Sequence, residues 1–200
     1  IVTGDHFGMG KEAARLMSDA IGGAGKIGII DHDAVFYVTN NRDRYFKAAI
    51  EQLYPEIEIV AEQGFAEEGR TQEIAAAMIT QNPDLDGIYV AWSSAAQGVI
   101  AALREAGKSD VKVVAYDLDA TNDLDMAQCG NMAAVALDWP YLEGRTMALL
   151  GAHALLGNET PAFVTVPVQT ETRDTIEQVW HDNVNATPPQ EILDALAEPC

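Results

Sequence analysis

Short apolar runs alternate with longer amphipathic stretches along most of the chain. Apolar runs of the kind that buried strands require lie at Lys26–Ile30, Ile57–Val60, Gly87–Ala91, Val111–Tyr116 and Met132–Leu137. Between them, apolar residues recur at helical spacing in Met9–Ile21, Asn41–Leu53, Glu67–Gln81, Ala95–Ala106 and Asn122–Gln128. Strands that alternate with helices in this way predict an α/β fold, with an open parallel sheet and helices on both of its faces.

The C-terminal part of the chain breaks this alternation. Helices are predicted at Tyr141–Leu156, Thr172–His181 and Glu191–Ala197, and a strand at Phe163–Val168. Pro167 lies within that strand and cannot donate a hydrogen bond to a neighbouring strand. The strand is therefore predicted at the edge of the sheet or at a crossing between two lobes.

The strand Val111–Tyr116 ends at a carboxylate, Asp117. Ligands of open parallel sheets bind beyond the carboxyl ends of the strands, which makes Asp117 a candidate for ligand contact. The alternative role is an N-cap of the next helix, which is predicted to begin near Asp119. Other predicted strands also end in polar or aromatic residues, and this favours a shared binding site along that edge of the sheet.

The composition and the net charge argue against some classes of binding partner. Hydrophobic residues make up 48% of the 200 residues, enough for a folded core. The net charge of −19 argues against nucleic acid and against anionic membranes, because both bind Lys and Arg surfaces. No apolar run has the length of a membrane span, so direct membrane insertion is not expected. Cys129 and Cys200 could pair in an oxidising compartment, but nothing in the sequence requires it.

The N-terminal segment Thr3–Gly10 carries the T-G-x-x-x-G-x-G pattern of short-chain dehydrogenases, whose glycines let the backbone approach a pyrophosphate. That turn should close a strand, yet only two residues precede it here. The same family places a catalytic Tyr and Lys four residues apart, and none of the six tyrosines is followed by Lys at that spacing. A dehydrogenase is therefore kept only as a remote alternative.

Motifs along nearly the whole chain resemble those of the type I periplasmic sugar-binding proteins of the ribose-binding kind. Five segments carry the resemblance: Asp5–Lys11, Asn41–Phe46, Asn82–Val111, Val113–Asp117 and Ala133–Pro140. The first two are similar to the family's D-N-x-x-G-G hinge and R-x-x-G-F segments, and the last two to its V-V-G-F-D and A-x-I-x-Q-x-P segments. The chain departs from the family at Tyr45, which replaces a glycine, and at Asp138, which replaces the glutamine.

The resemblance implies a two-lobed solute-binding protein of a bacterial ABC importer. Such a protein captures a sugar or polyol by hinge closure, performs no chemistry, needs no cofactor, delivers its ligand to a membrane permease and resides in the periplasm. It also implies that residues 1–138 and 165–200 form the C-terminal ligand-binding lobe. Residues 139–164 would return to an N-terminal lobe that is mostly missing from this chain.

The effector-binding domain of a repressor of the lactose-repressor type is the alternative, because it shares this lobe architecture. Such repressors carry a DNA-binding headpiece and remain in the cytoplasm. The strong acidity and the long tail after Thr170 favour the transporter hypothesis.

The resemblance and the chemistry of sugars together predict a binding site. Sugars are held by charged groups that hydrogen-bond to hydroxyls and by aromatic rings that lie on the apolar faces of the sugar ring. The predicted contacts are Arg42, Asp117 and Asp138 for hydroxyls, Phe65 and Trp92 for stacking, and His32, Phe36 and Tyr37 as further candidates.

Several of these residues could instead have a purely structural role. Asp138 could cap the helix that follows it. Phe65 and Trp92 could simply pack a loop against the lobe.

The charged segment Asp31–Asp33 could take part in an ion pair or in a metal site. Arg42 could pair at the surface with Asp31 or Asp33. Asp31, His32 and Asp33 could suggest a metal site, but adjacent residues at a strand end point in different directions, so none is predicted.

Overall fold

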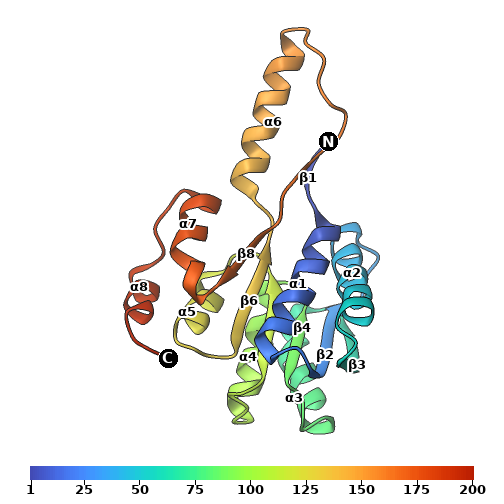
Figure 1. The fold of residues 1–200 in the computed structure, drawn as a ribbon, viewed down its shortest axis with the longest axis vertical. Coiled ribbons are helices and arrows are strands. Elements are labelled where there is room, and N and C mark those ends of the chain that lie inside the picture. The colour runs from blue at the N-terminus through green and yellow to red at the C-terminus, as the bar shows by residue number, and fades with distance from the viewer.

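The computed structural model describes all 200 residues and is built around a six-stranded sheet (Figure 1). The strands follow the order β3-β2-β4-β5-β6-β8, and every neighbouring pair is parallel except β6 and β8. Their bounds are β2 (Gly25–His32), β3 (Ile57–Phe65), β4 (Gly87–Val90), β5 (Lys112–Tyr116), β6 (Met132–Leu137) and β8 (Gln169–Thr172). The predicted α/β class with an open, mainly parallel sheet is confirmed.

Helices cover both faces of this sheet, which explains the uninterrupted apolar strand sequences. One face carries α1 (His6–Ile21) and α2 (Tyr37–Leu53), and the other carries α3 (Thr71–Gln81), α4 (Ser93–Glu105), α5 (Ala120–Ala127), α7 (Ile176–Val184) and α8 (Gln190–Leu196). Side chains of β5 alternate between the two cores. Val113 and Ala115 belong to one, and Val114 and Tyr116 to the other.

Helix α1 illustrates how local sequence sets an element. Its N-cap is Asp5, whose carboxylate accepts a hydrogen bond from the Gly8 N–H at 2.9 Å. The apolar stripe seen in the sequence, Met9, Ala13, Leu16 and Met17, is buried against the sheet. Gly10 lets α1 approach α2, because a Cβ there would lie 2.4 Å from the backbone oxygen of Arg42.

A second, smaller unit projects from the sheet. It consists of a two-stranded parallel sheet, β1 (Val2–Gly4) with β7 (Val164–Val166), and of α6 (Pro140–Leu155), which has no buried residue and extends away from the sheet (Figure 1). The chain passes between the two units at three places: after β1, after β6 and between β7 and β8. Thus Val2–Gly4 is not part of the six-stranded sheet.

Two elements in the first half of the chain differ from the predictions. The strand expected at Ile57–Val60 continues to Phe65, because its pairing with β2 persists as far as His32. The helix expected from Asn41 begins at Tyr37, where the Asn40 side chain accepts a hydrogen bond from the Phe36 N–H at 2.6 Å.

Two elements in the C-terminal part also differ. The strand expected at Phe163–Val168 is shorter, since β7 ends at Val166. The chain then leaves β1 at Pro167 and forms a second strand that was not predicted, β8, at the edge of the main sheet. The helix expected at Thr172–His181 begins only at Ile176, after β8 and one turn of 3-10 helix. Pro167 lies in neither strand. It is in the connection from the two-stranded sheet to β8, which is at the edge of the main sheet, so the assignment of Pro167 to a strand is wrong and the crossing at this residue agrees with the structure.

Cys129 and Cys200 form a disulfide, with their Cα atoms 5.6 Å apart. It ties the C-terminal end of the chain to the turn after α5. The sequence left this pairing open. None of the helices combines the length and the hydropathy that crossing a bilayer would need.

Candidate functional site

A cavity of about 380 Å³ opens at the carboxyl ends of the parallel strands. Its lining comes from the ends of β2, β4, β5 and β6 and from the start of α2. The lining residues are His32, Phe36, Val38, Thr39, Arg42, Trp92, Asp117 and Asp138. Strands β2 and β4 are neighbours although β3 separates them in sequence, so the cavity lies where ligands of such sheets bind.

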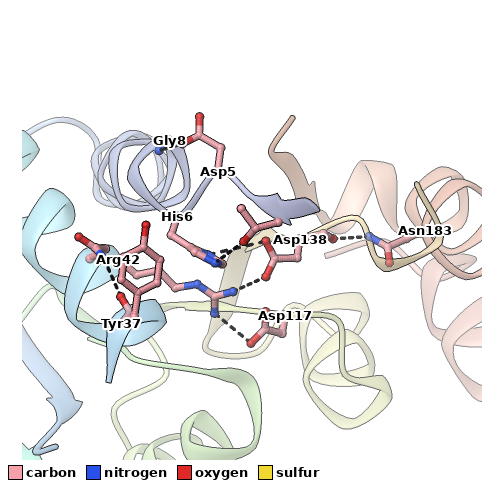
Figure 2. Close-up of polar contacts among 10 residues, drawn as sticks. Asp5, His6, Gly8, Tyr37, Arg42, Asp117, Asp138 and Asn183 are labelled. Carbon is pink, nitrogen blue, oxygen red and sulfur yellow. Dashed lines mark hydrogen bonds and ion pairs between the residues drawn. The ribbon is translucent and has the colours of Figure 1, made fainter. Parts of the chain in front are cut away.

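The guanidinium of Arg42 lies between two carboxylates at this rim (Figure 2). Its Nη1 donates to Asp117 Oδ2 at 3.2 Å, and its Nη2 donates to Asp138 Oδ2 at 2.5 Å. The Arg42 side chain is only 4% exposed. Burial alone would lower the pKa of Arg42, but the two carboxylates outweigh burial and raise it. Arg42 therefore stays charged and fixes both acids.

Arg42 is held in place by a buried network of two tyrosines and one aspartate. The guanidinium carbon lies 4.9 Å from the ring centroid of Tyr116, whose hydroxyl is 3.1 Å from that of Tyr89. Tyr89 in turn donates to Asp43 Oδ1 at 2.6 Å. Burial raises the pKa of Asp43 to about 6. Because Asp43 follows Arg42 on α2, this network holds α2 against the ends of β4 and β5.

Asp117 has a strained backbone and an open side chain. Its φ is +70°, a left-handed conformation that costs a non-glycine residue of order 1–3 kcal/mol. The helix cap that follows is Asp119, whose carboxylate accepts from the N–H groups of Thr121 and Asn122. Asp117 is thus not the N-cap, and 41% of its side chain is exposed. Burial of the remainder, opposed by Arg42, raises the pKa of the Asp117 carboxyl.

Asp138 is held from three sides. Its carboxylate accepts from Arg42, its backbone oxygen accepts from Asn183 Nδ2 at 2.8 Å, and His6 Nδ1 lies 3.9 Å from its Oδ1 (Figure 2). Burial lowers the pKa of His6 despite this carboxylate. The N-cap of α6 is Trp139, without a side-chain cap, so the capping role considered for Asp138 is wrong.

Aromatic rings form the other side of the cavity. Trp92 lies edge-on to His32, with ring centroids 4.9 Å apart, and to Phe65 at 4.7 Å. The indole Nε1 donates to Glu68 Oε2 at 3.1 Å, and His32 Nδ1 lies 3.3 Å from Thr39 Oγ1. Phe65 thus packs against the ring of Trp92.

Six of the eight predicted residues line this cavity, namely Arg42, Trp92, Asp117, Asp138, His32 and Phe36. The structure does not bring the other two to it. Phe65 is the last residue of β3, a strand that was predicted to end at Val60, and it is only 2% exposed. Tyr37 is 60% exposed in the first turn of α2, with its ring 6.1 Å from that of His6.

Sequence reasoning missed several residues of the site. Val38 and Thr39 line the cavity, and His6 contacts Asp138. The early start of α2 is what places Val38 and Thr39 at the rim, and no sequence signal marked it. The segment around His6 was identified as a hinge, which offered a partial signal.

The possible roles of Asp31 and its neighbours are also resolved. Arg42 pairs with neither Asp31 nor Asp33, and it is Lys47 that lies 3.6 Å from Asp31 Oδ2. No group of three or more His, Cys, Asp or Glu side chains is placed to hold a metal ion.

The N-terminal glycine segment has a different role from a phosphate-binding turn. Contrary to the sequence argument, a strand does precede it, since β1 covers Val2–Gly4. However, β1 lies outside the main sheet, and the Asp5 carboxylate takes the Gly8 N–H at the helix N-terminus. A phosphate would need that same N–H group and would meet a like charge. The dehydrogenase alternative is therefore dropped.

Solved structures of other proteins share this fold. An ABC transporter solute-binding protein from Agrobacterium vitis, bound to α-D-tagatopyranose, is 22% identical with a TM-score of 0.79; the match covers 88% of this chain and 59% of that one. A carbohydrate transporter solute-binding protein from Agrobacterium radiobacter, in complex with D-arabinose, is 23% identical with a TM-score of 0.81, over 91% of this chain and 64% of that one.

An arabinose-binding protein from Geobacillus stearothermophilus has the same fold, with 21% identity and a TM-score of 0.81 over 88% of this chain and 64% of that one. The present chain thus spans about three fifths of the length of these structures. A family described as a periplasmic binding protein domain matches residues 1–159. This confirms the resemblance seen in the sequence motifs: the chain belongs to the periplasmic binding protein family.

Proposed function

We propose that the chain binds a sugar or polyol as part of the solute-binding component of a bacterial ABC importer. The observation that carries the proposal is the meeting of Arg42, Asp117 and Asp138 beside the ring of Trp92 in one cavity. Carboxylates accept hydrogen bonds from hydroxyls, and an aromatic face suits the apolar face of a sugar ring. Relatives bound to tagatopyranose and D-arabinose support a carbohydrate ligand. No chemical reaction is part of the proposal.

Capture is proposed to occur by closure of two lobes about a hinge. The connections between the two units lie close together, since a side chain at Gly4 would collide with the Asp138 carboxylate and one at Gly8 would approach Val168. Adjacent short connections suit a rigid rotation of one body against another. We assign residues 139–164 to the second lobe and most of the rest to the ligand-binding lobe. Residues 2–4 and 165–166 are moved to the second lobe, because β1 pairs with β7 over the whole length of both strands.

We propose a location outside the cytoplasm and a membrane permease as partner. The Cys129–Cys200 disulfide supports the location, because disulfides persist in oxidising compartments and are rare in the cytosol. The same bond disfavours the repressor hypothesis. Cell fractionation checks this directly: the protein is expected in the periplasmic fraction, and recovery with the cytoplasm or on DNA would favour the repressor.

Calorimetric titration of the full-length protein against pentoses, hexoses and polyols tests the ligand class. We expect saturable, heat-producing binding of at least one member of this panel. If no member of the panel binds and a different class of solute does, such as an amino acid, then the ligand is not a sugar or polyol.

A further inference from the structure

The aromatic side of the cavity has few free polar atoms. The only polar atom of the Trp92 side chain is already bonded to Glu68, which does not line the cavity. The hydroxyl of Thr39 is paired with His32 Nδ1, and Phe36 and Val38 have no polar side-chain atoms. What remains is His32 Nε2 and the unused hydrogen-bonding capacity of the Thr39 hydroxyl. This side therefore presents mainly ring and methyl carbons to a ligand.

The charged side of the cavity combines two carboxylate acceptors with the remaining N–H groups of one guanidinium. Each terminal nitrogen of Arg42 gives one of its two N–H groups to Asp117 or Asp138, and its Nε–H is buried without a partner. The half-open carboxylate of Asp117 is left as the accessible acceptor. One guanidinium faces two carboxylates, so the lining has an excess of negative charge. A ligand carboxylate or phosphate would meet this excess of negative charge and would be repelled.

From these two sides we infer the chemical class of the ligand, an inference that rests on the proposed function. We propose that the site selects a neutral hydroxylated molecule that carries an apolar substituent, such as a deoxy sugar or a thioether-substituted sugar. Its hydroxyls donate to Asp117, and its methyl or thioether group lies against Trp92 and Phe36. Fully hydroxylated and acidic sugars are disfavoured.

The preference has a physical cause on each side. A hydroxyl placed against Trp92 would lose its hydrogen bonds to water without gaining a partner, whereas a methyl group there leaves water at no such cost. Discrimination of this kind between close analogues is typically ten- to a hundredfold. The excess carboxylate adds a repulsive element against acidic sugars, which sharpens specificity.

Matched pairs of ligands test the inference by calorimetry on the full-length protein. The pairs are D-galactose with D-fucose, D-ribose with 5-methylthioribose, and D-galactose with D-galacturonate. In each of the first two pairs that the protein binds, the deoxy or thioether member is expected to bind at least tenfold more tightly than its hydroxylated partner. In the third pair, D-galacturonate is expected not to bind. Equal or tighter binding of the hydroxylated member, or binding of the uronate, overturns the inference while leaving the proposed function intact.

Substitutions locate the preference on the aromatic side. Trp92→Asn and, separately, Phe36→Ser are expected to weaken binding of the deoxy or thioether member more than that of its partner, so that the ratio of affinities falls at least threefold. Phe36 is 54% exposed, so its variant keeps the test valid if the Trp92 variant fails to fold. An unchanged ratio in a folded variant overturns the inference. If no sugar binds the parent protein, the proposed function fails, and this inference fails with it.

Discussion

Arg42 and Asp117 lie 75 residues apart in the chain, yet Arg42 Nη1 donates to Asp117 Oδ2 at 3.2 Å across the carboxyl edge of the sheet. The contact joins the first turns of α2 to the end of β5, and Asp138 joins the same guanidinium from the end of β6. The buried guanidinium on α2 therefore links the ends of β5 and β6, although these three elements are distant in sequence. This arrangement both closes the rim of the sheet and leaves part of Asp117 open to a ligand.

Replacing Asp117 by alanine is expected to weaken ligand binding by a factor of ten or more. The variant loses an acceptor for ligand hydroxyls and leaves Arg42 with one carboxylate, and one buried polar contact is worth about 1.4 kcal/mol or more, which is tenfold in affinity. The dissociation constant of the ligand found by calorimetry is the measurement.

Asp84→Ala is the matched control for this variant. It also removes a carboxylate that is paired with a cation, Lys26, but at an exposed position before β4, at the opposite edge of the sheet. Its affinity should equal that of the parent. Equal affinity of both variants would show that the site is misplaced.

Gly10→Ala is expected to lower the free energy of unfolding by about 1–3 kcal/mol, the usual cost of forcing extra volume into a close contact. The new methyl group would meet the backbone oxygen of Arg42 at 2.4 Å and push α2 away from α1. Because α2 carries Arg42, ligand affinity should fall as well. Urea denaturation and calorimetry measure the two effects.

Gly144→Ala provides the comparison within a helix. Gly144 lies in α6 with nothing within 4 Å of its Cβ position, so alanine should be neutral or slightly stabilising there. If Gly10→Ala behaves in the same way, then α1 and α2 do not approach as closely as described.

The pH dependence of stability should report on Glu171. This side chain is fully buried on β8, and burial together with the neighbouring Asp123 raises the pKa of Glu171 to about 9. Between its ordinary pKa near 4.5 and about 9, the folded protein keeps a proton that the unfolded chain releases. The free energy of unfolding therefore falls as the pH rises through this window.

Glu171→Gln removes the titrating group while keeping its shape. Its advantage in thermal stability over the parent should be absent near pH 4.5 and should grow towards pH 9. Glu177→Gln, an exposed change on α7, should leave the parent's pH dependence intact. A Glu171→Gln variant whose stability follows the parent at every pH would mean that Glu171 does not hold a proton in the folded state.

Reduction of the Cys129–Cys200 disulfide is expected to cost about 2–4 kcal/mol of stability, the range for bonds that close long loops. The bond closes a loop with a sequence separation of 71 residues. Urea denaturation with and without a reductant measures the loss. A Cys129→Ser/Cys200→Ser variant should not respond to reductant, and free thiols in the oxidised native protein would contradict the bond.

The α/β class and most helices and strands could be predicted because the strands are buried on both faces and therefore read as apolar runs. The exact ends of the strands could not be predicted, because they depend on pairing between distant segments. Phe65 continues β3 only because β2 offers a partner as far as His32, and Pro167 divides two strands that join different sheets. The helix and strand preferences of individual residues do not reveal which distant segments pair.

The polar residues of the site were predicted from their position after apolar runs, but their mutual contacts were not. Arg42 was equally compatible with a surface pair to Asp31 or Asp33, because both lie near in sequence. Only the fold brings Asp117 and Asp138 to it. The capping role of Asp119 was likewise indistinguishable from one for Asp117 until the backbone of each was known.

A crystal structure of the full-length protein with its bound ligand shows whether the ligand lies at this rim of the sheet. We expect a hydroxylated ligand within hydrogen-bond distance of the Asp117 carboxylate, with its apolar face or substituent against the ring of Trp92. A ligand bound at another edge of the sheet, or one that touches neither of these side chains, would contradict this expectation.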